Sequence, residues 1–133
     1  MDTCLFCKII ACEIPSEIIY EDEKVLVFLD INPTTNGDTL IIPKEHSKDI
    51  LELPSNILSH MHDIVKKLYP IYKEKLKCDG LTISTNTDYS QEIKHMHIHF
   101  IPRYLDDGVK HLSNKEKLKD IKEISKILKE NTQ

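Results

Sequence analysis

Three histidines alternate with apolar residues in the segment His95-Met96-His97-Ile98-His99, and this spacing constrains the fold more than any other feature of the chain. An alternation with a period of two residues is typical of a β-strand, because successive side chains point to opposite faces. We therefore expect a strand over Ile93–Pro102. Its apolar side chains would face a core, and the three imidazoles would share the opposite face.

Three imidazoles on one strand face need a specific reason, since Ser, Thr, Lys or Glu would suit a solvated face. One catalytic zinc ion bound by all three is disfavoured, because the outer two positions lie about 13 Å apart on a strand and zinc–nitrogen bonds are only about 2 Å long. The spacing instead favours a different role for each of the three histidines. One histidine would be a nucleophile or base, one would bind phosphate, and one would have another role nearby.

The other patterns predict one α+β domain spanning residues 1–133. β-Branched runs bounded by turn signals predict a sheet of about five strands that begins with an antiparallel meander. Apolar residues at helical spacing predict a main helix that starts at its N-cap Ser55, is kinked or interrupted at Pro70, and closes near residue 78. A C-terminal helix is expected over Ser113–Lys129, in a tail of about 113–130. The expected strands lie at residues 18–21, 25–29, 39–42, 81–85 and 93–102.

The composition excludes several classes of function. The formal net charge is −4, and Arg103 is the only arginine, so a nucleic-acid backbone binder is disfavoured. Three glycines cannot form a G-x-G-x-x-G motif or a P-loop at their positions. No apolar run is long enough for a membrane span, and the first residues lack a signal-peptide pattern, so we expect a cytoplasmic protein. Without a secretory signal, the four cysteines indicate metal binding or burial more than disulfides.

The histidine run resembles the signature of the histidine triad (HIT) superfamily, in which three histidines alternate with apolar residues. Other segments resemble the bacterial and Hint-like branch of that superfamily in the same order, over about residues 4–108. The resemblance implies a five-stranded antiparallel sheet with one main helix, and a homodimer in which two sheets join into ten strands. The matching segments are 4–10, 13–16, 20–22, 28–33, 41–46, 91–93 and 101–104.

The resemblance also implies a reaction at the α-phosphate of a nucleotide. His97 would be the nucleophile and form a nucleotidyl-histidine intermediate, and His99 would donate to phosphate oxygens. Asp30 would accept the ribose hydroxyls, although an Asp before Asn32-Pro33 also suits a turn. Apolar residues would surround the base, and polar residues of one loop would approach the phosphate. These further nucleotide-binding residues are Ile14, Phe28, Leu29, Ile31, Asn86, Gln91 and Glu92.

The chain departs from the family pattern in the loop before the histidines. Asn86 precedes Gln91 by five residues, where family members commonly show seven. Glu92 stands where many Hint-like members have a serine that assists the leaving group. Phe28 and Ile31, taken without the family, are equally well explained as core residues.

Two cysteines and two histidines form a candidate zinc site. Cys4 and Cys7 alone are also explained as buried thiols. With His46 and His95 they make the composition of a structural Cys₂His₂ zinc site, and related branches of the superfamily bind zinc at the matching positions. By contrast, His60 and His62 point to different faces of a helix, and His111 suits a surface loop.

The sequence therefore predicts a hydrolase of nucleoside 5′-phosphoramidates or related nucleotidyl derivatives. Its substrate would be a purine nucleotide, a derivative of AMP or GMP, with neither nucleic acid nor membrane as a partner. One alternative is a dinucleoside polyphosphate hydrolase, although few basic residues lie near the histidines. The other is a zinc-stabilised module that binds nucleotides without turnover.

Overall fold

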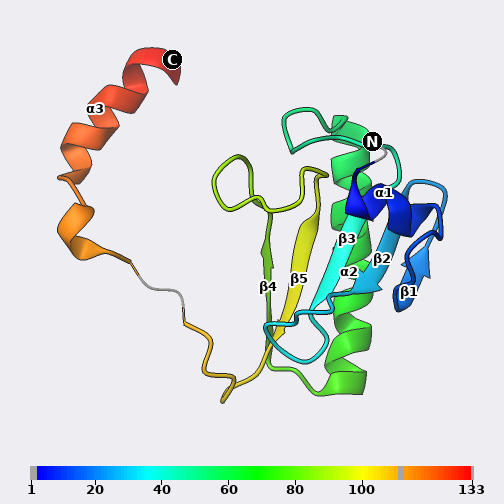
Figure 1. Cartoon of the computed structure of the whole chain (residues 1–133). Helices are drawn as coiled ribbons and strands as arrows, with labels where there is room; N and C mark the ends of the chain where they lie inside the picture. The colour runs from blue at the N-terminus through cyan, green and yellow to red at the C-terminus, as the bar shows by residue number, and fades with distance from the viewer. Residues whose placement is uncertain (1–2, 111–112, 133) are drawn as a thin grey trace.

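The computed structural model describes residues 3–110 and 113–132, and five strands and three α-helices account for about half of them (Figure 1). The strands are β1 (Ile18–Glu21), β2 (Val25–Leu29), β3 (Thr39–Pro43), β4 (Gly80–Ser84) and β5 (Ile98–Arg103). The helices are α1 (Leu5–Ile10), α2 (Ser55–Leu76) and α3 (Ile121–Thr132), with a short 3₁₀ helix, η1, at Lys115–Lys117. None of the helices in this part of the chain is both long and apolar enough to cross a membrane.

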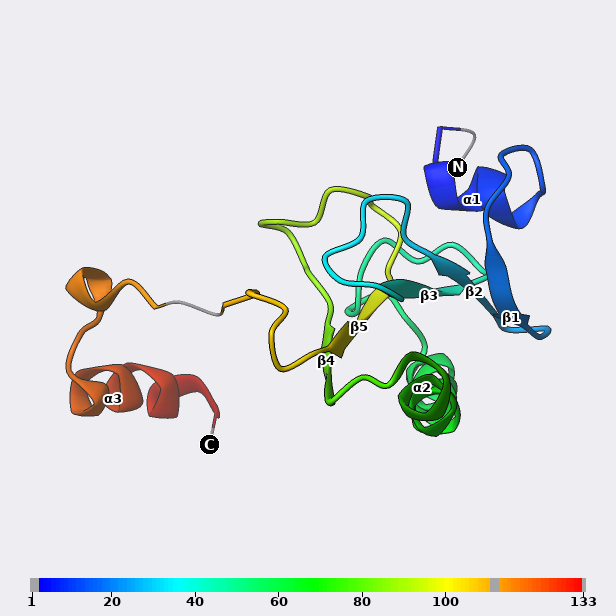
Figure 2. The ribbon, with the colours of Figure 1, turned by 90° about the horizontal axis from the view of Figure 1, so that it is seen from below.

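The strands form one sheet in the order β1-β2-β3-β5-β4, and every neighbouring pair is antiparallel. Helix α2 covers one face of the sheet and α1 lies on the other (Figure 2). Alternating residues of β2 and β3 therefore enter two separate cores. Val25, Val27 and Ile41 pack with α2, whereas Leu26, Phe28, Leu40 and Ile42 pack with α1. The expected α+β fold with a five-stranded antiparallel sheet is confirmed.

Helix α2 continues through Pro70, so the expected interruption there is wrong, and the alternative of a kink stays a prediction. Pro70 and Lys66 are both exposed, and water can bond the Lys66 carbonyl oxygen that a proline leaves without its helical donor. Buried residues on either side of Pro70, Leu68 and Tyr72, hold the helix on the sheet. The expected cap is also wrong, since Pro54 is the N-cap and no side chain caps the helix.

The last strand starts at Ile98, five residues later than expected. Its ladder with β3 ends at the pair Ile41 and Ile98. Before this pair the chain bonds to the segment after β3 instead, because the Met96 N–H donates to the Ser47 carbonyl oxygen at 2.7 Å. His95 and His97 therefore lie just before β5. The alternation of faces is nevertheless confirmed, because Met96, Ile98 and Phe100 all enter the core under α2.

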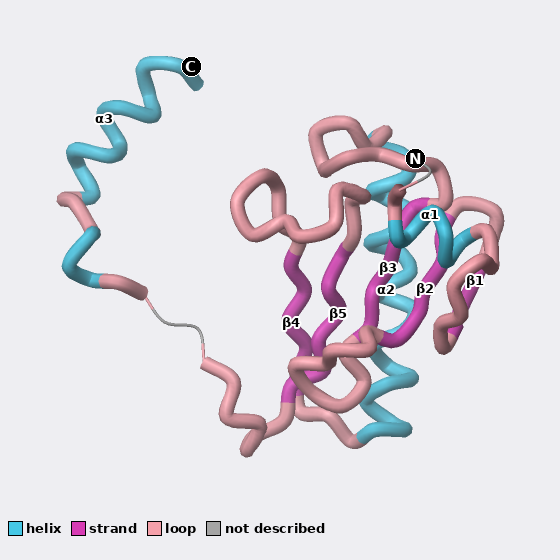
Figure 3. The backbone as a smooth tube through the Cα atoms, in the orientation of Figure 1, coloured by secondary structure: helices cyan, strands magenta, loops and turns pink. Residues whose placement is uncertain are grey.

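Both ends of the chain differ from expectation. Helix α1 was absent from the sequence prediction; Cys4 caps it, with its Sγ atom accepting from the Cys7 N–H at 3.4 Å. The C-terminal helix begins at Ile121, not at Ser113, and it lies apart from the sheet (Figures 1–3) with Ile121 exposed. His111 lies outside the described residues.

A charged contact joins the β1–β2 turn to α2. Asp22 accepts hydrogen bonds from the Lys24 and Val25 N–H groups, from Tyr20 Oη at 2.8 Å and from His60 Nε2 at 2.7 Å. Burial opposes ionisation of Asp22, but these bonds together outweigh it and hold its pKa well below the usual range. The carboxylate therefore stabilises the folded state above the ordinary pKa of an aspartate, and this contribution is lost as the pH falls.

We expect Asp22→Asn to lower the free energy of unfolding by about 2 kcal/mol at pH 7, the size typical of hydrogen bonds to a charged group. The difference from wild type should shrink as the pH is lowered below about 4, where the unfolded-state carboxyl is protonated. Urea unfolding across pH measures both effects. Asp63→Asn, at an exposed position on α2, is the matched control. A constant difference at all pH values would contradict the assignment.

Candidate active site and metal centre

A cavity of about 410 Å³ opens on the α1 side of the sheet. Its walls come from α1, the segment before β1, the end of β2, and the loop from β4 to β5. Almost all the residues predicted to surround a nucleotide line it together with His97. They are Ile14, Phe28, Leu29, Asp30, Ile31, Asn86, Glu92 and His99.

Gln91 is the exception among the predicted nucleotide-binding residues. Its side chain is buried, does not line the cavity, and donates from Nε2 to the Lys48 carbonyl oxygen at 2.6 Å. In this structure Gln91 ties the β4–β5 loop to the segment after β3. Its sequence position showed that it belonged to this loop but not which way its amide would turn.

Several lining residues were not predicted from the sequence. Leu5, Phe6 and Ile9 come from α1, a six-residue helix that is too short for its apolar periodicity to stand out in the sequence. The others carry no distinctive pattern; they are Pro15, Ser16, Asn32, Leu40, Ser90 and Ile93.

His97 is held in one tautomer. Its Nδ1–H donates to the His95 carbonyl oxygen at 2.7 Å, so the lone pair is on Nε2. The side chain is 6% exposed, and burial lowers its pKa, against a smaller opposing effect of the bond to His95. A neutral imidazole with one free nitrogen lone pair is the form required of a nitrogen nucleophile. The His99 ring lies edge-on to it, with centroids 4.8 Å apart.

Two carboxylates lie near the histidines. Asp30 lines the cavity and also accepts the Asn32 N–H at 2.9 Å, so the two interpretations of this residue, ligand and turn former, are compatible. Asp38, which the sequence did not single out, is 3% exposed and accepts the Thr34 N–H at 2.8 Å. Burial raises the pKa of Asp38, and the neighbouring Asp30 adds to the effect.

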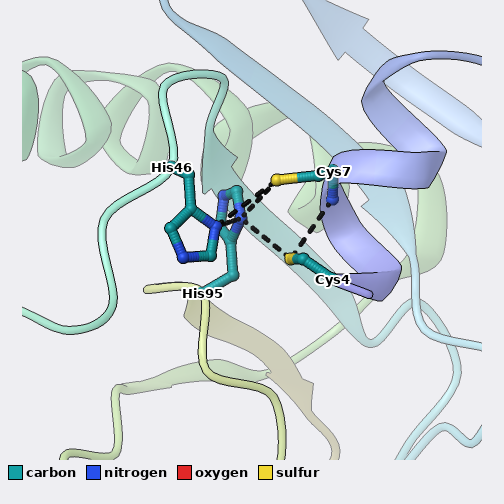
Figure 4. A group of neighbouring side chains, drawn as sticks. All are labelled: Cys4, Cys7, His46 and His95. Carbon is teal, nitrogen blue, oxygen red and sulfur yellow. Dashed lines mark hydrogen bonds between the residues drawn. The ribbon is translucent and has the colours of Figure 1, made fainter. Parts of the chain in front are cut away.

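Cys4, Cys7, His46 and His95 point toward one another beside the cavity (Figure 4), and their ligand atoms all lie within 4.8 Å of each other. His95 Nδ1 is 3.4 Å from Cys4 Sγ, 3.6 Å from Cys7 Sγ and 3.2 Å from His46 Nδ1, and Cys7 Sγ is 3.4 Å from His46 Nδ1. A tetrahedral zinc ion with ordinary bond lengths separates its ligands by about 3.3–3.8 Å. The four side chains therefore fit zinc.

The orientation of His95 also suits a cation at this position. His95 Nε2–H donates to the Pro43 carbonyl oxygen at 2.8 Å, which leaves the Nδ1 lone pair directed at the thiols. Burial, with a further contribution from the adjacent Cys4, raises the pKa of the Cys7 thiol. A bound zinc ion would reverse that tendency by stabilising the thiolate. The ligands join α1, the segment after β3 and the segment before β5.

The model of the HIT domain family matches residues 11–106 of this chain. The chain belongs to the HIT family. The matched region of this HIT protein contains the three histidines and most of the cavity, whereas Cys4 and Cys7 lie before it. The resemblance inferred from the sequence is confirmed.

Relatives of this HIT protein occur in archaea, bacteria and yeasts. An uncharacterised HIT-like protein of Methanocaldococcus jannaschii is 45% identical, covering 90% of this chain and 98% of its own. The Saccharomyces cerevisiae protein named adenosine 5′-monophosphoramidase HNT1 is 38% identical, covering 75% of this chain and 62% of its own.

Solved HIT structures share the fold. A HIT family protein from Bacillus anthracis has a TM-score of 0.81 at 34% identity and covers 99% of both chains. A Zn-bound histidine triad family protein from Mycobacterium smegmatis has a TM-score of 0.78 at 32% identity and covers 97% of this chain and 92% of its own.

Proposed function

We propose that this protein hydrolyses nucleoside 5′-phosphoramidates or related nucleotidyl derivatives at the α-phosphorus. The observation that carries the proposal is the bond from His97 Nδ1–H to the His95 carbonyl oxygen, because it leaves the Nε2 lone pair free on a residue that lines the cavity. The name of the S. cerevisiae relative supports the same kind of reaction.

In the proposed reaction, His97 Nε2 forms a bond to the α-phosphorus as the bond from phosphorus to the leaving group breaks. The leaving amine takes up a proton from solvent and departs. Water then attacks the nucleotidyl-histidine, which releases the nucleoside monophosphate and restores His97. His99 donates a hydrogen bond to the phosphate oxygens, a role that arginine has in many phosphate sites.

The residues at the cavity favour a leaving group of low charge. No Lys or Arg is among the described lining residues, whereas Glu92 is. A polyphosphate leaving group would meet this carboxylate without a compensating cation, so dinucleoside polyphosphates are the second choice.

Turnover assays with adenosine 5′-phosphoramidate, guanosine 5′-phosphoramidate and diadenosine tetraphosphate test the proposal. We expect the phosphoramidates to have the higher kcat/KM. Faster cleavage of the tetraphosphate would favour the dinucleoside alternative. Binding of AMP without turnover of any substrate would favour the non-catalytic module.

Asp30 is proposed to accept the ribose hydroxyls. We expect Asp30→Ala to weaken AMP binding by about 1.5–3 kcal/mol, the range for hydrogen bonds to a charged group. Calorimetry with AMP and with its 2′,3′-dideoxy analogue measures this effect. The analogue should bind wild type weakly and be indifferent to the substitution. Equal losses for both ligands would assign Asp30 to the turn alone.

We also propose that the protein binds structural zinc at Cys4, Cys7, His46 and His95, which the cluster geometry and the Zn-bound relative support. We propose in addition that two chains form a homodimer through β4. This strand is at the edge of the sheet, and Ile83 on it is exposed. Light scattering is expected to give the mass of two chains.

A further inference from the structure

We propose that Phe6 is a positioning residue that couples occupancy of the metal centre to the orientation of His97. This inference rests on the proposed function, and it assigns to that site a form of regulation by metal. Phe6 touches the imidazole proposed as nucleophile and belongs to the same short helix as the two cysteines.

The position of Phe6 depends on the cysteines. It lies between them in sequence, on α1, and its side chain is only 4% exposed. Helix α1 has six residues, too few to be stable by itself. Its N-terminal turn is held by the Cys4 cap and by the contacts of both thiols with the imidazoles. A metal ion bound by these groups would therefore fix the point from which Phe6 projects.

The Phe6 ring meets three other rings at their edges. Its centroid lies 5.0 Å from that of His97, 5.7 Å from that of His95 and 5.6 Å from that of Phe28, with interplanar angles between 74° and 88°. His95 is a proposed metal ligand, and Phe28 lines the cavity. Phe6 thus stands at the junction of the metal cluster, the nucleophile and the wall of the nucleotide cavity.

The other contacts of His97 leave its ring able to rotate about one axis, and Phe6 opposes this rotation. The bond from Nδ1 to the His95 carbonyl oxygen sets the tautomer and one direction of the ring. Rotation about that bond would still tilt Nε2, and the edge contacts with Phe6 on one side and His99 on another oppose this tilt. Nucleophilic attack depends on alignment, so a small loss of orientation lowers kcat more than it lowers affinity.

The decisive variant is Phe6→Leu, compared with Phe100→Leu as the matched control. Phe100 is fully buried on the other face of the sheet, where its ring packs against Tyr72. Both substitutions remove the same atoms from a core. We expect Phe6→Leu to keep one zinc per chain, lower kcat by about tenfold and change the Kd for AMP by less than about threefold. Phe100→Leu should reduce stability and leave kcat within about twofold of wild type.

A second measurement requires no turnover. The ring signals of His97 in an NMR spectrum are expected to move and broaden when zinc is chelated from wild type, and to respond much less in Phe6→Leu. Because this readout is independent of activity, failure of the proposed hydrolysis would leave the coupling testable. If Phe6→Leu does not fold, Phe6→Met, which keeps the volume without the flat ring, takes its place.

Three results would overturn the proposal. One is an unchanged kcat in zinc-loaded Phe6→Leu. Another is an equal fall in kcat in Phe100→Leu, which would assign the effect to general destabilisation. The third is a His97 signal that does not respond to zinc removal in wild type, or that responds as strongly in Phe6→Leu as in wild type.

Discussion

Hydrolysis of adenosine 5′-phosphoramidate is expected to fall by at least about 10³-fold when His97 is replaced by Asn, while AMP still binds. The asparagine amide retains a donor for the His95 carbonyl oxygen, so the local backbone keeps its hydrogen bond. It has no nucleophilic nitrogen, and no intermediate can form. Steady-state kinetics and AMP calorimetry on the same preparation separate the loss of chemistry from a loss of binding.

The matched control for this variant is His62→Asn, at an exposed position on α2. It makes the same chemical change away from the cavity and should leave kcat and stability near wild type. Retention of more than about a tenth of kcat in His97→Asn would rule out His97 as the covalent nucleophile.

Loss of zinc is expected to have the largest effect on stability. The four ligands join the N-terminal helix to two segments more than thirty residues further along the chain, and metal binding in such sites contributes directly to the free energy of folding. We expect Cys4→Ser, or chelation of wild type, to lower the free energy of unfolding by about 4 kcal/mol or more. Metal analysis should find one zinc per chain, with X-ray absorption distances of about 2.3 Å to sulfur and 2.0–2.1 Å to nitrogen.

Cys12→Ser is the control for the zinc prediction, because Cys12 is an exposed thiol that follows the same helix. Its zinc content and thermal stability should match those of wild type. If Cys4 and Cys7 are only buried apolar residues, Cys4→Ala will be tolerated better than Cys4→Ser and chelators will have no effect. Zinc well below half an equivalent, in protein purified without added metal, would also contradict the prediction.

The parts of the fold that could be predicted depend on local patterns. Strands β2 and β3 are dense in β-branched and aromatic residues, and the apolar stripe of α2 continues across Pro70. Helix α1 was missed because six residues carry too few turns for a periodic pattern to stand out. The start of β5 was misplaced because the residues before Ile98 bond to the segment after β3, as the Met96 N–H does to Ser47, and the local alternation does not reveal this partner.

The same distinction applies to the candidate site. Asp30, Asn86, Glu92, His97 and His99, which the motifs singled out, line one cavity, and their roles there stay predictions. They could not reveal that the Gln91 amide turns to Lys48, or that Asp38 is buried near Asp30. Each of these depends on a neighbour that the sequence pattern does not identify.

The family, the antiparallel α+β sheet and the residue types available for chemistry can be inferred from the chain alone, because they follow from periodicity and from motifs within short stretches of chain. The way in which one residue, His95, contributes to two sites depends on the folded structure. Its ring turns to thiols about ninety positions away while its carbonyl oxygen holds the His97 ring. Such an arrangement depends on the path of the whole backbone, and the local pattern of histidines is compatible with several paths.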